Sequence, residues 1–132
     1  MIRWILLCTP WFAVYLHHFI RDDPGDLHDH PRGFVSIGLW GEYWEKTPLR
    51  LTLFRAPWVR QFPPERRHRI LLTPGATCWT LAIAGPRVRE WGFWETHSWG
   101  ASWGTGYWEN FTPWRQYVVE HGGVPEEKPS CP

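Results

Sequence analysis

The sequence has little excess charge, few cysteines and no long apolar run. Fourteen lysine and arginine residues against thirteen acidic residues leave a formal net charge of +1. This balance excludes the strongly basic surface typical of nucleic-acid-binding domains. No window approaches the ~18 consecutive apolar residues of a transmembrane helix. The N-terminal apolar run is short, contains Pro10 near its end and lacks a following small-residue cleavage site, so we expect no signal peptide.

Cysteine is scarce. Cys8, Cys78 and Cys131 form an odd set without CxxC spacing. Such a set provides no disulfide framework and is typical of proteins in a reducing compartment. We therefore expect a cytoplasmic protein without membrane or nucleic-acid partners.

Proline and glycine are abundant instead, with 13 and 12 residues respectively. They divide the chain into about ten short segments with β character. This pattern is typical of a sandwich or barrel, and 132 residues are enough for one core. We expect a single domain over residues 1–119 and a flexible polar tail over residues 120–132.

The apolar and polar positions predict individual strands and one weak helix. The helix is expected over residues 112–120, and residues 87–94 are expected to pair back on the strand before them. The other predicted strands cover residues 11–20, 27–30, 34–40, 42–46, 49–53, 58–62, 68–72 and 79–83.

Twelve tryptophans are an unusual number for a chain of this length. Large side chains can fill the interior of a small barrel, and we expect most of the tryptophans there. Five of them are too densely spaced for all to be buried, so some should line a pocket or a contact surface. These five are Trp91, Trp94, Trp99, Trp103 and Trp108.

Histidines form the most distinctive pattern. His28 and His30 flank Asp29, and His68 follows much later in Pro63-Pro64-Glu65-Arg66-Arg67-His68. Histidines at i and i+2 on a strand point to the same face, and a third from another strand could complete a half-shell of imidazoles. Imidazole suits iron, zinc, copper and nickel better than calcium or magnesium. The alternative is that these are surface or hydrogen-bonded histidines without a metal.

These segments resemble the two motifs of the cupin superfamily, which consists of small double-stranded β-helix (jelly-roll) barrels that hold a metal. The run HDHPRGFVSIGLWGEYWE, with RHRI and TLAIAGPRVREWGFW, is similar to small cupin-like proteins common in bacteriophage and bacterial genomes. The resemblance covers roughly residues 11–95. It implies an all-β cupin barrel with His28, His30 and His68 as ligands of a divalent transition metal, Fe²⁺ first and Zn²⁺, Mn²⁺ or Ni²⁺ next.

The chain departs from the cupin pattern at one ligand. The superfamily usually has a glutamate where this sequence has Phe34 or Val35. The resemblance therefore implies either a three-histidine site, as in thiol dioxygenase-like cupins, or a carboxylate from elsewhere. Glu45 is the leading candidate, as a ligand or general base, with a solvated strand glutamate as the alternative. Strand alternation places Tyr43 on the same face, so Tyr43 is a second candidate catalytic residue, with simple packing as its alternative.

Other polar residues rank lower. Asp29 should face away from the metal and serve as a structural acceptor. His17 and His18 precede the first histidine of the motif, and one of them could face the cavity. His97 is expected in a Gly/Trp-rich loop that could act as a lid.

Three functional interpretations follow. The first is a metalloenzyme, dioxygenase-like or an isomerase, because three protein ligands leave coordination positions open for a small-molecule substrate. The second is a non-catalytic, tryptophan-rich binding module for a sugar, nucleotide or protein. The third is a purely structural metal, which a barrel of this size does not need. A homodimer through the N-terminal strand is a further expectation from the resemblance.

Overall fold

The computed structural model describes residues 1–126; residues 127–132 lie outside the described part. Residues 1–126 form ten strands and one helix, which confirms the predicted all-β barrel. In chain order the elements are β1 (Ile2–Cys8), β2 (Ala13–Phe19), β3 (Leu27–His28), β4 (Phe34–Lys46), β5 (Leu51–Arg55), β6 (Trp58–Phe62), β7 (Arg69–Leu71), β8 (Cys78–Ala84), β9 (Gly92–Ala101), β10 (Gly104–Pro113) and α1 (Trp114–Glu120).

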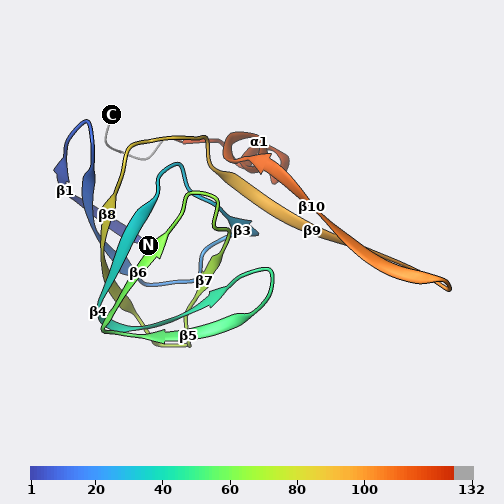
Figure 1. The fold of residues 1–132 in the computed structure, drawn as a ribbon, viewed down its shortest axis with the longest axis horizontal. Coiled ribbons are helices and arrows are strands. Elements are labelled where there is room, and N and C mark those ends of the chain that lie inside the picture. The colour runs from blue at the N-terminus through green and yellow to red at the C-terminus, as the bar shows by residue number, and fades with distance from the viewer. Residues whose placement is uncertain (127–132) are drawn as a thin grey trace.

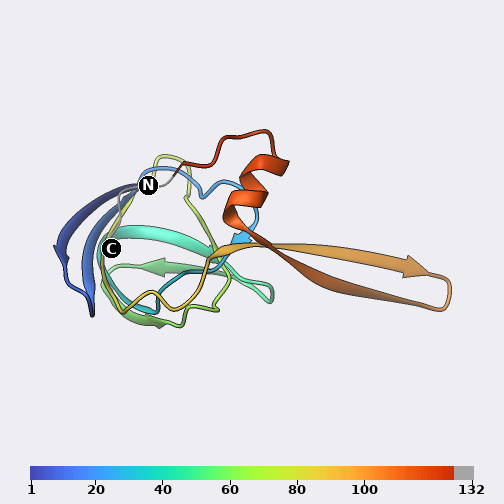
Figure 2. The same ribbon diagram turned by 90° about the horizontal axis from the view of Figure 1, so that it is seen from above.

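The strands pair antiparallel in two sheets. The larger sheet has the order β1-β2-β8-β4-β5, with β6 and β7 also paired to β4, and the smaller sheet has the order β10-β9-β3. Figure 1 shows the strands of the larger sheet curving around the barrel, while β9 and β10 continue well beyond it as a long hairpin. Seen from above, the hairpin projects to one side and α1 lies at its base (Figure 2).

Strand β4 is the central element of the barrel. Its first half pairs with β8 and β6, and its second half pairs with β5 and β7. The strand changes partners at Gly41, which has φ +87° and lies next to a register shift between Gly38 and Trp40. A positive φ is accessible to glycine without a steric penalty. Gly41 therefore lets one strand serve two parts of the sheet.

One part of the barrel interior is lined by small side chains. Ala13, Ala82 and Ala84 are at most 4% exposed and pack with Tyr15. Along β2, Ala13, Tyr15 and Phe19 are buried, whereas the residues at positions 14, 16 and 18 are half-buried on the outer face. The strand predicted over residues 11–20 is confirmed, and its buried face carries two aromatic rings beside the alanine.

The prediction that most tryptophans fill the barrel interior is wrong. Among residues 1–126, Trp114 is the one tryptophan in the buried core. The expectation that some of the dense tryptophan series is exposed is confirmed on the β9–β10 hairpin. The exposed tryptophans are Trp4, Trp11, Trp40, Trp99, Trp103 and Trp108.

The region after β8 differs most from the sequence prediction. Residues 87–91 form no strand, and β9 pairs with β10 and β3 rather than with β8. His97 lies within β9 opposite Trp108, so its predicted loop position is wrong. Gly85 and Pro86 end β8 without a tight hairpin because the following segment crosses to the other sheet.

The C-terminal part of the described chain contains α1, which confirms the helix predicted over residues 112–120. Trp114 and Tyr117 of α1 pack with Phe93 of β9 in a separate small core. No helical segment within residues 1–126 has the length and apolar character needed to cross a membrane.

The cysteines also bear on the sequence prediction. Cys78 is a buried free thiol, whereas Cys8 is disulfide-bonded, which corrects the expectation of unpaired thiols at that position. Residues 127–132 of the predicted tail, which include Cys131, lie outside the described residues.

The role of Gly41 can be tested by adding one methyl group. A Cβ at this position would collide with the Thr77 carbonyl oxygen and strain a left-handed backbone. We expect Gly41→Ala to lower the free energy of unfolding by about 2–4 kcal/mol, measured by urea denaturation. The control is Gly75→Ala, which has a similar φ of +81° but open space around the added carbon, and should cost only about 1 kcal/mol. Equal losses for the two variants would contradict the close approach at β4.

Candidate metal centre

The three predicted histidines come together where the two sheets meet. His28 ends β3, His30 follows it, and His68 directly precedes β7. His28 and His68 form an antiparallel bridge: each backbone N–H donates to the other residue's carbonyl oxygen at 2.9 Å. The backbone N–H of His30 donates to the Pro64 carbonyl oxygen at 3.0 Å. The segments that carry the imidazoles are thus fixed by backbone hydrogen bonds.

The imidazole nitrogens converge. One ring nitrogen from each of His28, His30 and His68 lies within 4.8 Å of the other two. The Nε2 atoms of His30 and His68 are 2.9 Å apart, and the three ring centroids are separated by 4.9–5.2 Å. This is the half-shell of imidazoles that the sequence predicted.

Burial keeps His28 and His30 neutral, which is the form that binds a metal. Burial, with the neighbouring His68, lowers the pKa of His28 to about 3. The pKa of His30 also falls well below its usual range, first because of burial and then because of His68 and His28. The donor set is therefore suited to a borderline transition metal.

Glu45 faces the barrel interior but lies behind His68. Its Oε2 accepts a hydrogen bond from His68 Nδ1 at 2.9 Å, and its Oε1 accepts from Arg60 at 2.9 Å and from Arg66 at 2.6 Å. Because a carboxylate can only accept, Nδ1 of His68 carries a proton, and Nε2 is the ring nitrogen that faces His30. The carboxylate is 2% exposed and does not belong to the converging donor group. In this arrangement Glu45 orients a ligand.

The ionisation of Glu45 depends on its partners. Burial by itself would raise its pKa, but the hydrogen bonds from His68, Arg60 and Arg66 outweigh burial and hold the pKa at about 2. The carboxylate therefore stays charged and holds His68 in one tautomer.

Tyr43 shares the inward face with Glu45, as the alternation predicted. It is 2% exposed and packs with Phe19, Ile70 and Cys78. Its hydroxyl oxygen accepts a hydrogen bond from Arg60 at 3.3 Å. Burial raises the pKa of Tyr43, so the phenol remains protonated, and its place is in the core beside the Glu45 network.

Asp23 is the residue near the histidines that sequence reasoning missed. Its Oδ2 lies 3.9 Å from His28 Nε2 and accepts the Ile70 backbone N–H at 2.8 Å. Burial raises the pKa of Asp23, while the Ile70 hydrogen bond and nearby His68 oppose this effect. Asp23 lies between the strands predicted over residues 11–20 and 27–30, where no periodic pattern indicates that it folds back against β7.

Asp29 turns away from the imidazoles, as expected. It is fully buried and accepts hydrogen bonds from the Gly92 N–H at 2.9 Å and Trp94 Nε1 at 3.0 Å. Arg89 pairs with the same carboxylate at 3.0 Å. Asp29 therefore anchors the start of β9 beside the histidines.

Aromatic rings surround the three histidines. Phe34 packs edge-on against His30, and Phe62 lies 5.4 Å from His68 between ring centroids. Trp91 and Phe93 lie at 6.3 and 6.4 Å from His28. These rings limit access of water to the imidazoles, which strengthens electrostatic interactions inside the site.

The lower-ranking histidines stay outside the group. His17 accepts a hydrogen bond from Arg3 Nε at 3.1 Å, and His18 stacks on Trp79. His97 stacks on Trp108 along the hairpin. The structure thus separates the three predicted ligands from the other described histidines.

Comparisons with known proteins identify the fold. No protein-family model matches the sequence, and no curated protein matches it. Several solved structures match the fold of the chain. A protein with a double-stranded β-helix domain from Klebsiella pneumoniae aligns with a TM-score of 0.55 at 18% identity, over 68% of this chain and 80% of that one. A cupin-like protein from Thermotoga maritima aligns at 0.51 and 20% identity, over 63% and 66% of the two chains.

A third match is the polyketide cyclase RemF from Streptomyces resistomycificus, with a TM-score of 0.52 and 19% identity. The alignment spans 58% of this chain and 56% of the cyclase, so the chain corresponds to only part of that enzyme. At these identities the matches show the fold. The chain has the double-stranded β-helix barrel fold of these cupin structures.

Replacing the Glu45 carboxylate should affect both stability and metal binding. Glu45→Gln removes the charge that Arg60 and Arg66 share, so we expect a loss of about 3 kcal/mol in the free energy of unfolding. It also loosens His68, and we expect divalent metal affinity to fall by about 10–100-fold. Urea denaturation measures the stability, and calorimetric titration measures the metal affinity.

The control is Glu42→Gln on the same strand. The partner of Glu42, Arg55, is 74% exposed, so this variant should change stability by less than ~1 kcal/mol. Unchanged metal affinity in Glu45→Gln would show that the carboxylate does not orient a ligand.

The lowered pKa of His28 predicts acid sensitivity of the metal-free protein. Between pH 6.5 and 4.5 the unfolded chain takes up a proton at this histidine, whereas the folded chain does not until about pH 3. The stabilisation is therefore complete above pH 6.5 and falls as the pH is lowered. We expect the slope of unfolding free energy against pH, measured by urea denaturation between pH 6.5 and 4.5, to be smaller in His28→Gln than in the wild type. The difference should be roughly 1.4 kcal/mol per pH unit. Parallel pH profiles for the two proteins would mean that His28 is protonated in the folded state.

Proposed function

We propose that this protein is a small-molecule metalloenzyme whose mononuclear centre is held by His28, His30 and His68, with iron(II) as the first candidate metal. The convergence of three imidazole nitrogens within 4.8 Å carries the proposal. Three ligands leave coordination positions open, as in catalytic rather than closed structural sites. Iron(II) held by these three histidines would supply oxygenase chemistry.

The surrounding residues have distinct roles in this proposal. Glu45 fixes the tautomer and orientation of His68. Asp23 presents a carboxylate oxygen 3.9 Å from His28 Nε2, outside the converging donor group, and acts on His28 rather than as a further ligand. The aromatic rings around the site exclude water and favour an apolar or aromatic portion of a substrate.

The fold neighbours agree with small-molecule chemistry. One is named as a polyketide cyclase, and another is a putative mannose-6-phosphate isomerase from Ralstonia eutropha, with a TM-score of 0.55 and 18% identity over 64% of this chain and 83% of that one. These names support an enzyme on this barrel and leave the substrate of the present chain to experiment.

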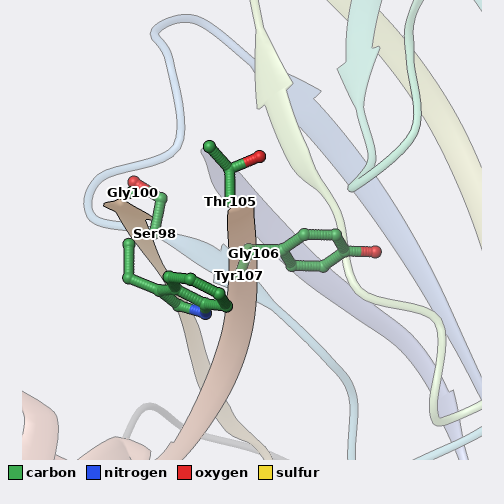
Figure 3. A pocket seen from close by; sticks show the side chains of 6 residues that line it. Ser98, Gly100, Thr105, Gly106 and Tyr107 are labelled. Atoms are coloured by element: carbon green, nitrogen blue, oxygen red, sulfur yellow. The ribbon is translucent and has the colours of Figure 1, made fainter. Parts of the chain in front are cut away.

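A binding module is the second candidate function, and the β9–β10 hairpin favours it. Trp103 and Tyr107 are 80% and 70% exposed. Figure 3 shows an open hollow on the hairpin, lined by residues 98–100 and 105–107. Trp99 crosses Gly106, where any Cβ would collide with the indole ring. An exposed aromatic surface of this kind is typical of ligand or partner contact.

Metal content distinguishes the two candidates. Protein purified without a metal-affinity tag and analysed for elements should contain about one equivalent of iron per chain. The His28→Ala/His68→Ala variant should lose it, because two of the three ligands are gone. Oxygen consumption with small thiols and carboxylic acids then tests the chemistry.

The matched control removes two histidines outside the centre. His17→Ala/His18→Ala should keep the metal at the wild-type level. Zinc, nickel or manganese in place of iron would overturn the oxygenase assignment and favour isomerase or hydrolase chemistry. Wild-type protein that takes up no metal after reconstitution would contradict the metalloenzyme and leave the hairpin-based binding module.

A further inference from the structure

A second group of metal-binding side chains lies at the base of the hairpin, away from the three histidines. Asp26, Glu95 and His121 each place one donor atom within 4.8 Å of the other two. They come from three parts of the chain: the segment before β3, strand β9 and the residue after α1. The sequence gives no sign of this group because its members are far apart along the chain.

Tyr117 of α1 orients two of these three side chains. Its hydroxyl donates to Asp26 Oδ2 at 2.7 Å. Its backbone carbonyl oxygen accepts from His121 Nδ1 at 2.8 Å, and the His121 ring stacks on the Tyr117 ring at 3.9 Å. Because a carbonyl can only accept, Nδ1 of His121 carries the proton and Nε2 keeps a lone pair. A histidine held through its other nitrogen is the usual arrangement of a metal ligand.

Tyr117 is itself rigid. It is 6% exposed and stacks on Phe93 at 3.9 Å. Gly25, with φ +77°, lets the chain pass directly over the tyrosine, since a Cβ there would lie 3.0 Å from the Tyr117 hydroxyl. The donor side chains lie at the surface, and the buried Tyr117 beneath them fixes Asp26 and His121.

The two carboxylates of the group are not neutralised. Within residues 1–126, neither Asp26 nor Glu95 forms an ion pair with a lysine or an arginine. The nearest ionisable partner of Glu95 is His97, whose Nε2 lies 3.7 Å from Oε2. Two carboxylates this close repel each other unless a cation lies between them.

We propose that Asp26, Glu95 and His121 bind a second divalent metal ion, with zinc as the best match. Two carboxylate oxygens and one imidazole nitrogen are a common zinc ligand set, and water completes the tetrahedron. The ion balances the two negative charges and joins the segment before β3, strand β9 and the end of α1. It thus clamps α1 and the base of the hairpin onto the barrel.

Zinc titration of the full chain, followed by calorimetry after removal of bound metal, tests the proposal. The measurement uses the His28→Ala/His68→Ala background, in which only the second site is intact. We expect this variant to bind about one equivalent of zinc, and the added change His121→Ala to weaken that binding at least about tenfold. In the wild-type background, His121→Ala should lower the zinc stoichiometry by one equivalent, a result that remains available if the double variant does not fold.

Tyr117→Phe tests the positioning role separately. It keeps the ring stacking and removes only the hydroxyl that holds Asp26, so zinc affinity should fall about tenfold or more with unchanged stoichiometry. His18→Ala, which removes a histidine that stacks on Trp79 outside the group, is the matched control and should bind zinc like its parent. Zinc binding unaffected by His121→Ala, or weakened equally by His18→Ala, would overturn the site. Neither result depends on whether the three-histidine centre binds iron.

Discussion

The backbone bridge between His28 and His68 is the constraint on which the site depends. It joins the two sheets, because β3 pairs only with β9 whereas the segment after His68 continues into β7 on the β4 side. The same pair of hydrogen bonds sets the distance between two imidazoles. A shift of one residue in this register would turn one histidine to the other face. The geometry of the centre and the closure of the barrel therefore depend on one contact.

A buried charge network supports this contact from the β4 side. Glu45 accepts hydrogen bonds from His68, Arg60 and Arg66 with its two oxygens. Removing a carboxylate from water is costly, and several donors are needed to offset that cost. Because Arg60 lies on β6 and Arg66 on the following turn, the network also ties that turn to the interior. Arg66, two residues before His68, thus contributes to the site although its side chain is 37% exposed.

Sequence reasoning predicted the parts of this structure that depend on local pattern. Alternation identified most strands, and the His28–His30 spacing with His68 identified the converging group. It failed where the chain changes sheets: the 87–94 segment looks like a hairpin partner, yet its last residues join the other sheet. It also missed Asp23, because a turn residue gains its place beside His28 from a hydrogen bond to Ile70 that only tertiary structure provides.

The tryptophans contribute to the outer face of the larger sheet rather than to its interior. Strand β8 shows this division, because its buried positions are Cys78, Thr80, Ala82 and Ala84 whereas Trp79 lies on the other face. Trp79 stacks on Trp4 of β1 and on His18 of β2, with centroids 5.6 and 4.0 Å apart. Cross-strand aromatic pairs of this kind stabilise a sheet. The outer rings thus join β1, β2 and β8 on the face opposite the centre.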